Sequence, residues 1–258
     1  MKSLSPKTGS EKKALRPRAR EIDERYWRSA LDVTSTNWEG RKSAFARAVE
    51  PERRTKGARD SWHTGLKYLA VQYSAGIGLA EIGAAVGSVA ESYSTWVELA
   101  IDLPDRSPSL SEGNDYYVSV LRLLGLAVGS SRSDSAALIL DAVSRQGADA
   151  LFDGLSARLG GRHRVGDVEV STPRLARPLV VALDQPSSAP QQLRKYLQDW
   201  PSRMKPLSWM GSLDHVRPGD EYGEGFVGYW AFEVPAIVRA ADVDFDGVES
   251  PFLPNDLL

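Results

Sequence analysis

The sequence predicts a mainly α-helical fold made of two packed helical parts. Apolar residues recur at helical spacing along most of the chain. The clearest apolar stripe consists of Trp62, Leu66, Leu69 and Tyr73. The alternation typical of strands is almost absent, and at most a short hairpin is expected near residues 162–171. Glycine and proline clusters separate the helical stretches, as expected for helices joined by loops.

The N-terminal helical part is expected over residues 20–103, after a basic and disordered lead-in at residues 1–19. Its helices each carry an apolar face, and Gly76 and Gly78 interrupt the pattern between the last two. The expected helices cover about residues 21–31, 42–49, 62–73 and 79–101.

A linker at residues 104–114, rich in proline, serine and acidic residues, precedes a C-terminal helical part at residues 115–258. The helices expected there cover about residues 117–128, 133–146, 148–159, 174–184, 190–204 and 224–241. Pro235 lies inside the last of them. Because proline removes a backbone donor, this helix is expected to bend or to begin again at Pro235.

The composition is that of a globular protein, with 42% hydrophobic residues and 7 tryptophans among 258 residues. There is no cysteine, which excludes disulfides, thiolate metal sites and a cysteine nucleophile and fits a reducing compartment. The basic, polar start lacks the apolar core of a secretory signal. No apolar run approaches the roughly 20 residues that span a bilayer. These features favour a soluble, cytoplasmic protein without a membrane segment.

The charge is unevenly distributed along the chain. Residues 1–60 hold 16 Lys and Arg against 9 Asp and Glu, a balance of +7, which leaves 16 against 25, or −9, for residues 61–258. Residues 200–258 alone hold 4 against 10, or −6. This split favours an acidic face for a cationic partner. An acidic surface that only keeps the protein in solution explains it equally well.

The sequence carries no catalytic or cofactor motif. The glycine-rich stretch at residues 76–83 follows a helix and lacks the spacing of a dinucleotide-binding loop, so helix packing explains its glycines. His63, His163 and His215 do not pair at the i, i+4 spacing that points two imidazoles at one metal. The sequence therefore predicts no metal, no cofactor and no enzymatic activity.

Glu233 lies among the aromatic residues of the expected closing helix, close in helical position to Phe226 and Trp230. A buried carboxylate costs several kcal/mol unless it is paired or hydrogen-bonded. We therefore expect a structural carboxylate with an arginine, a tyrosine hydroxyl or backbone amides as its partner.

The closing stretch, Gly-Tyr-Trp-Ala-Phe-Glu with an acidic turn and a Pro-Asn-Asp-Leu-Leu end, resembles the end of the PoNi family. These are the immunity proteins to polymorphic-toxin (PoNe-type) DNases. Further upstream pieces occur in the order of the family, so the resemblance covers about residues 21–258. The positions that match the motif are Gly228, Tyr229, Trp230, Phe232, Glu233, Pro254, Asp256 and Leu257. The chain departs from the family at Pro235, where alanine is usual, and at Phe252 and Leu253, where two tyrosines are usual.

The resemblance implies a protein that binds and neutralises a cognate DNase toxin, often one delivered by type VI secretion, and so protects the producing cell and its kin. The partner is then a nuclease toxin, with no membrane and no specific nucleic acid involved. Acidic residues are the expected toxin-binding positions, because a DNA-binding surface is cationic. They are Asp220, Glu221, Glu224, Asp242, Asp244, Asp246 and Glu249. The alternatives are a helical protein-binding scaffold of other specificity and an enzyme of unknown type.

Overall fold

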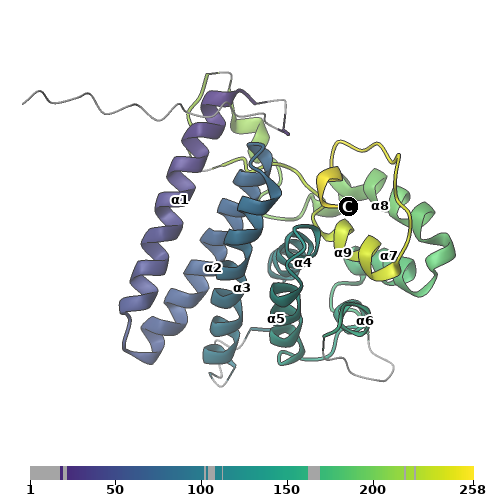
Figure 1. Ribbon diagram of the computed structural model, residues 1–258, viewed down its shortest axis with the longest axis horizontal. Coiled ribbons are helices and arrows are strands. Elements are labelled where there is room, and N and C mark those ends of the chain that lie inside the picture. The colour runs from purple at the N-terminus through teal and green to yellow at the C-terminus, as the bar shows by residue number, and fades with distance from the viewer. Residues whose placement is uncertain are drawn as a thin grey trace, which may run out of the picture.

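The computed structural model describes residues 18–19, 22–101, 103, 108–111, 113–161, 169–217, 219–223 and 225–258. In this part the chain forms nine α-helices, three 3₁₀-helices and no strand, so the predicted mainly α fold is confirmed (Figure 1). No helix of the described part is long and apolar enough to cross a membrane. Most of the predicted lead-in, part of the linker and residues 162–168 of the expected hairpin lie outside the described residues.

The first three helices lie side by side and run up and down the molecule (Figure 1). They are α1 (Glu24–Arg47), α2 (Pro51–Ser74) and α3 (Leu79–Ala100). Helix α2 lies in the middle and packs against both neighbours. The buried residues of α2 include the whole predicted stripe, from Trp62 to Tyr73. Helical spacing of apolar residues therefore sets which face of α2 lies inward.

Helix α1 corrects the expectation of two separate helices at residues 21–31 and 42–49. The apolar face continues between them through Thr34 and Trp38, which are both buried. Thr34 satisfies its hydroxyl by donating to the Ala30 carbonyl at 2.6 Å. The poor helix formers of this stretch are therefore overridden by burial against α2.

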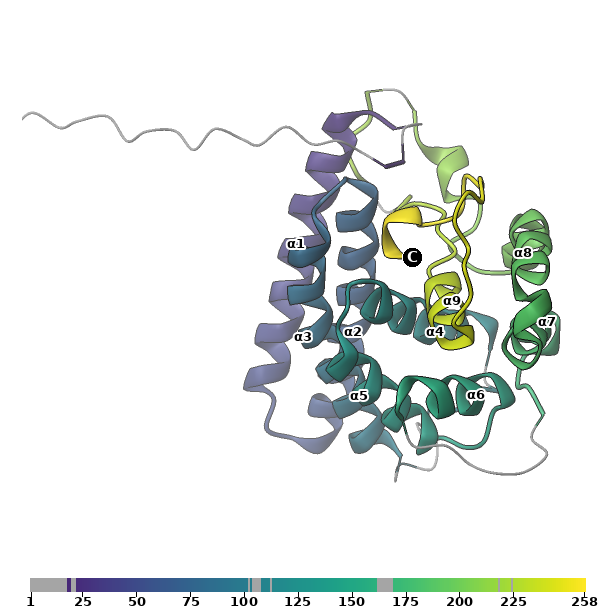
Figure 2. The ribbon, with the colours of Figure 1, turned by 45° about the vertical axis from the view of Figure 1, so that its right-hand side comes forward.

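The remaining helices form the second part of the molecule (Figure 2). They are α4 (Asn114–Gly129), α5 (Ser133–Ser144), α6 (Ala150–Leu159), α7 (Pro173–Asp184), α8 (Ala189–Met204) and α9 (Glu233–Ala241). Helix α9 packs against α4, α6 and α7, and α3 joins the two parts by packing against α4 and α5. One continuous hydrophobic core runs from Ala19 to Leu257 through both parts.

The expected closing helix at residues 224–241 is wrong in its first half. Residues 225–231 are not helical, and α9 begins only at Glu233. Gly228 has a φ of +97°, outside the helical region, and the Ala231 amide donates to the Phe252 carbonyl at 2.8 Å. Pro235 lies in the first turn of α9, where its missing N–H has no helical acceptor to lose. The helix thus starts two residues before Pro235, close to the predicted restart.

Candidate functional site

The C-terminal segment, residues 225–258, carries the predicted motif and lies against the end of α2. Ser74, the last residue of α2, donates to the Val227 carbonyl at 2.7 Å and accepts from Trp230 Nε1 at 2.8 Å. Gly228 passes between these groups, and a Cβ there would come within 2.1 Å of Ser74 Oγ. Both this contact and the positive φ require glycine at residue 228.

Tyr229 and Trp230 point to different neighbours. The Tyr229 hydroxyl accepts from the Gly211 and Leu213 amides, at 2.9 and 3.1 Å, and so fixes the turn that leads into η2 (Ser212–His215). The Trp230 ring meets the ring of Tyr73 edge to face, with centroids 5.1 Å apart. Only 8% of Trp230 is exposed, so its predicted burial is confirmed.

Glu233 is buried and has the donor partners expected from the sequence. Its Oε1 accepts from the Tyr196 hydroxyl and from Trp200 Nε1, each at 2.7 Å. Burial raises the pKa of Glu233, while these two hydrogen bonds and the charge of Arg122 act in the opposite direction. Glu233 is thus a structural carboxylate that joins α9 to α8.

Arg122, on α4, is the buried cation near Glu233. Its guanidinium lies 4.8 Å from the ring centroid of Trp209 and 5.4 Å from that of Phe232. Burial lowers the pKa of Arg122 to about 10, and the charge of Glu233 opposes this shift. Sequence reasoning did not identify Arg122, because it lies in a hydrophobic helical stretch and its partner is more than a hundred residues away.

The end of the chain is tied to the start of the described structure. Arg18 Nε donates to Asp256 at 2.6 Å, and Arg18 Nη1 donates to the Tyr73 and Ile77 carbonyls at 2.9 and 3.0 Å. The sequence predicts a disordered lead-in that includes Arg18, but these contacts hold Arg18 at the α2–α3 turn. Leu257 is buried against Gly129, where an added Cβ would come within 2.5 Å of it.

Three motif residues line a surface cavity of about 650 Å³ between the C-terminal segment and α2, namely Tyr229, Trp230 and Asp256. Aromatic rings form much of its wall, and Arg18 and Asp256 supply charge. Its lining includes Tyr73, Phe226, Tyr229, Trp230 and Phe252. Because most of these rings also pack into the core, the motif serves mainly to build the C-terminal part of the fold.

The predicted toxin-binding residues fall into two loops, which we call the acidic loops. The first, residues 219–223, carries Asp220 and Glu221; Glu224 lies outside the described residues. Glu221 pairs with Arg25 at 2.7 Å, and the side chains of both are 65% exposed. Asp220 accepts from the Arg217 amide at 2.7 Å.

The second acidic loop, residues 242–249, follows α9. Asp242 ends that helix in the left-handed conformation, with a φ of +51°, and Asp244 accepts from the Asp246 amide at 2.9 Å. The three aspartates and Glu249 are exposed, while Phe245 is buried and anchors the loop. The first acidic loop lies against the start of α1, where the Tyr222 amide donates to Ser29, whereas the second rises from the end of α9 toward η3 (Asn255–Leu257) (Figure 1).

The described residues contain no group of three or more His, Asp and Glu that could hold a metal ion. Two of the three histidines can be placed. His63 lies on α2 beside Trp62, with ring centroids 4.0 Å apart, and His215 ends η2. His163 lies outside the described residues.

Comparison with known proteins relates the chain to one family and to solved structures. Residues 147–257 match the family model "PoNe immunity proteins (PoNi), C-terminal". The crystal structure of protein PA2201 from Pseudomonas aeruginosa is similar in fold, with a TM-score of 0.63 and 20% sequence identity. That match covers 93% of this chain and 89% of the other. No curated protein matches the chain.

Proposed function

We propose that the protein binds and neutralises a cognate DNase toxin, because residues 147–257 match the family model of the C-terminal regions of PoNe immunity proteins. The family match is the observation that carries the proposal. The toxin is one that bacteria use against competitors, often through type VI secretion. The immunity protein acts in the cytoplasm, where the toxin meets DNA, and it works by binding rather than by turnover.

The contrast between buried motif residues and surface acidic loops supports a binding role. The motif residues are mostly buried and hold the segment on α2, α4 and α8. The acidic loops lie before and between them, and most of their acidic side chains are exposed. Exposed loops on a fixed scaffold can vary in sequence without loss of the fold, which suits recognition of one particular partner.

We propose the acidic loops as part of the toxin-binding face. A nuclease must attract phosphates and therefore presents Lys and Arg around its active site. Asp242, Asp244 and Asp246 would meet that surface with opposite charge, which accelerates encounter and orients the complex. If these residues formed only a solvated rim, each pair would contribute little, about 0–1 kcal/mol.

The test uses the nuclease encoded beside this gene, inactivated at its catalytic residue, as the binding partner. Asp242, Asp244 and Asp246 are changed together to asparagine, which tolerates the left-handed conformation at residue 242 and keeps the acceptor at 244. We expect association to slow by roughly tenfold or more at low salt and its salt dependence to flatten. Protection of cells that express the active nuclease should fall in parallel.

A matched control removes the same charge elsewhere. Glu52, Glu91 and Glu98 are exposed on α2 and α3, and their joint change to glutamine should leave association unchanged. If the aspartate variant behaves like this control, the second acidic loop is not the interface. If the wild-type protein neither binds the nuclease nor protects the cell, the proposed function itself is wrong.

A further inference from the structure

A second cavity, separate from the motif region and the acidic loops, lies between α2, α3, α4 and the turn at residues 208–209. Its volume is about 720 Å³, and we call it the α2–α4 groove. Its lining combines aromatic rings with cationic and small polar side chains. Its lining includes Lys56, Arg59, His63, Trp96, Asp115 and Trp209.

The groove has a firm aromatic wall. Trp96 stacks on the buried Trp62, with ring centroids 5.8 Å apart, and the Tyr116 ring meets Trp96 edge to face at 5.6 Å. Trp209 forms the opposite side and rests on the buried guanidinium of Arg122. Tryptophan, tyrosine and arginine are the residues that dominate the binding energy of protein interfaces. The wall is therefore suited to hold an apolar or aromatic side chain of a partner.

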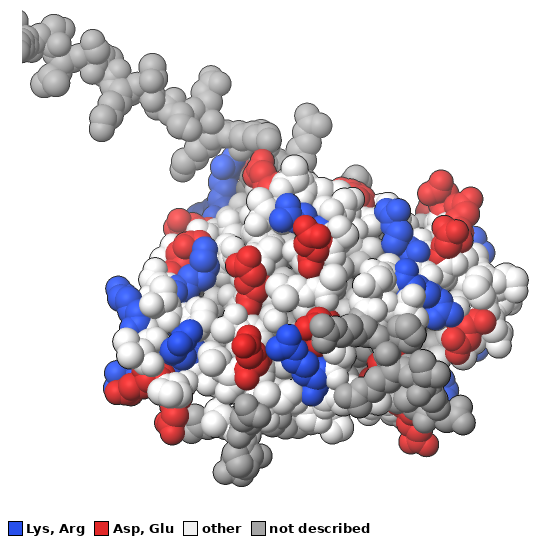
Figure 3. All heavy atoms as spheres, turned by 60° about the horizontal axis from the view of Figure 1, so that its bottom comes forward, with Lys and Arg blue, Asp and Glu red and all other residues white. Residues whose placement is uncertain are grey.

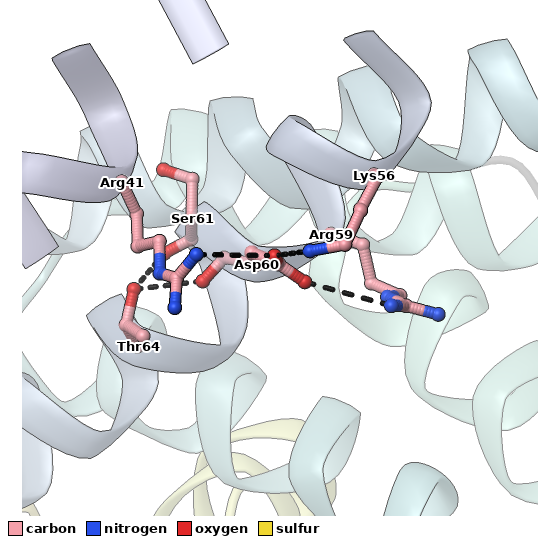
Figure 4. Close-up of polar contacts among 6 residues, drawn as sticks. All are labelled: Arg41, Lys56, Arg59, Asp60, Ser61 and Thr64. Carbon is pink, nitrogen blue, oxygen red and sulfur yellow. Dashed lines mark hydrogen bonds and ion pairs between the residues drawn. The ribbon is translucent and has the colours of Figure 1, made fainter. Parts of the chain in front are cut away.

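The rim of the groove carries an excess of positive charge, shown in Figure 4. Lys56, Arg59 and Arg41 all pair with the single carboxylate of Asp60; the Arg41 and Arg59 contacts are 3.5 and 3.6 Å. The three cationic side chains are 50–62% exposed, whereas that of Asp60 is 19% exposed. One carboxylate cannot neutralise three cations, so this cluster keeps a net charge of about +2 for a partner.

The other ionisable groups of the groove do not cancel this charge excess. His63 stays exposed at the edge of the groove, and partial desolvation together with the charge of Arg59 lowers its pKa, so the imidazole is neutral at physiological pH. Asp115 lies at the far side, where its carboxylate accepts from the Ser208 amide at 3.1 and 3.3 Å. The positive charge is therefore concentrated on the α2 side.

A smaller cavity of about 380 Å³ continues the basic surface toward the α1–α2 turn. It shares Lys56 with the groove and is also lined by Arg41, Arg47 and Arg53. Asp60 also lines this cavity and Arg53 pairs with Glu50 at 3.1 Å, so cationic side chains outnumber carboxylates here without forming a continuous basic surface.

We propose that the α2–α4 groove and its basic rim form a docking site for an acidic polypeptide segment that carries aromatic side chains. Carboxylates of the segment pair with Lys56 and Arg59, and one of its aromatic rings packs against the partly exposed rings of Tyr116 and Trp209, with the buried Trp96 behind them. The site is distinct from the acidic loops, which have the opposite charge. The protein then has two binding surfaces, one for a cationic partner and one for an acidic partner.

A polypeptide fits these observations better than a nucleic acid. The lower end of the molecule, where α1 turns into α2, has Lys and Arg interspersed with Asp and Glu rather than a continuous basic surface (Figure 3). A nucleic-acid backbone is held by phosphate contacts along a basic track, and the described residues of this face do not provide one.

The test measures binding of three probes to the full chain by calorimetry and by tryptophan fluorescence at low salt. The probes are a random copolymer of glutamate and tyrosine, poly-glutamate, and single-stranded oligo-thymidine. We expect the copolymer to bind more tightly than poly-glutamate and to change tryptophan emission, and the oligonucleotide to bind weakly. The double variant Lys56→Glu/Arg59→Glu should weaken binding of the copolymer by at least about tenfold.

Two controls make the result specific. Arg54→Glu/Lys195→Glu introduces the same charge change at exposed positions outside the groove and should bind like the wild type. Ser119→Trp fills the groove without changing charge and should also weaken binding, unlike Gln191→Trp on the surface of α8. Thermal unfolding of each variant confirms that it is folded.

Three outcomes would overturn the inference. They are no binding of the copolymer to the wild type, equal binding by groove and control variants, and tighter binding of the oligonucleotide at the same residues. None of them bears on the toxin, so the proposed immunity function stands or falls separately.

Discussion

Helices α1 to α3 and the C-terminal segment pack against each other along α2, but they are ordered by different contacts. In the three helices, backbone groups bond within each helix, and apolar stripes face the neighbouring helices. In the C-terminal segment, only α9 and η3 are regular. Much of the rest is held by residues distant in sequence, as in the Ser74 bond to Val227 and the Ala231 bond to Phe252.

This difference determines how each region responds to substitution. A long helix distributes its stability over many similar bonds, so one surface change in α1 has a small effect. The C-terminal segment depends on a few contacts that cannot be replaced by others nearby. Substitutions at those contacts should therefore be much more costly than substitutions on the helices.

The largest effect is expected for Glu233→Leu. The change leaves the Tyr196 hydroxyl and Trp200 Nε1 without their acceptor and removes the counter-charge of Arg122. Removing one partner of a buried charged network costs about 3–5 kcal/mol, and we expect the upper end of that range. Chemical denaturation of the variant measures the loss.

Glu233→Gln is the matched control, because its carbonyl can accept both hydrogen bonds. Its free energy of unfolding should lie within about 1 kcal/mol of the wild type. An equal loss in the two variants would show that the charge of Glu233, rather than its acceptor oxygen, stabilises the segment.

Trp230→Ala should cost about 4 kcal/mol, within the range for large aromatic residues in cores. It removes the edge-to-face contact with Tyr73 and the hydrogen bond to Ser74. Thermal unfolding gives the measurement. An unchanged melting temperature would contradict the assignment of Trp230 to the core.

Gly125→Ala should cost about 3 kcal/mol, at the upper end for overpacked sites. An added Cβ would lie 1.6 Å from the Phe232 carbonyl oxygen, and backbone atoms cannot rotate away as side chains can. Urea denaturation tests this. Wild-type stability would mean that the start of α9 does not pack closely on α4.

Glu233 also predicts a dependence of stability on pH. Burial raises the pKa of Glu233 in the folded protein above the ordinary value of 4.5. Between pH 4.5 and the folded-state pKa, folded Glu233 therefore keeps a proton that the unfolded chain releases. The contribution of Glu233 to the free energy of unfolding is fully present below pH 4.5 and is lost as the pH rises through the folded-state pKa. Urea denaturation across this pH range should show the decline in the wild type but not in Glu233→Gln. The prediction would be wrong if the stability of the wild type and of Glu233→Gln changed with pH in the same way.

The smallest effect, and one of opposite sign, is expected for Gly40→Ala in α1. No atom lies within 4 Å of an added Cβ there, and the residue is exposed inside a helix. Alanine should stabilise the protein by about 0.5–1 kcal/mol, because glycine is the poorer helix former. A loss of stability on thermal unfolding would show that α1 does not tolerate change as freely as proposed.

The sequence predicted the helical class because apolar periodicity is a local property. The stripe from Trp62 to Tyr73, the break at Gly76 and Gly78, and the helices at about 79–101 and 190–204 all agree with the structure. It also predicted that Glu233 would have a donor partner, since an unpaired buried carboxylate is too costly. The family resemblance in the closing stretch is confirmed over residues 147–257.

Only the tertiary structure decided how the closing stretch is built and which groups surround it. Phe226 and Trp230 have the spacing of a helix, yet Ser74 and Phe252 bind the backbone of this region in a non-helical form. Arg122, Tyr196 and Trp200 meet Glu233 from two other helices, and Lys56 and Arg59 meet Trp96 and Trp209 at the groove. These sites depend on pairs far apart in the chain. Local propensity determines a helix, but the energy of burying and pairing distant groups determines a site.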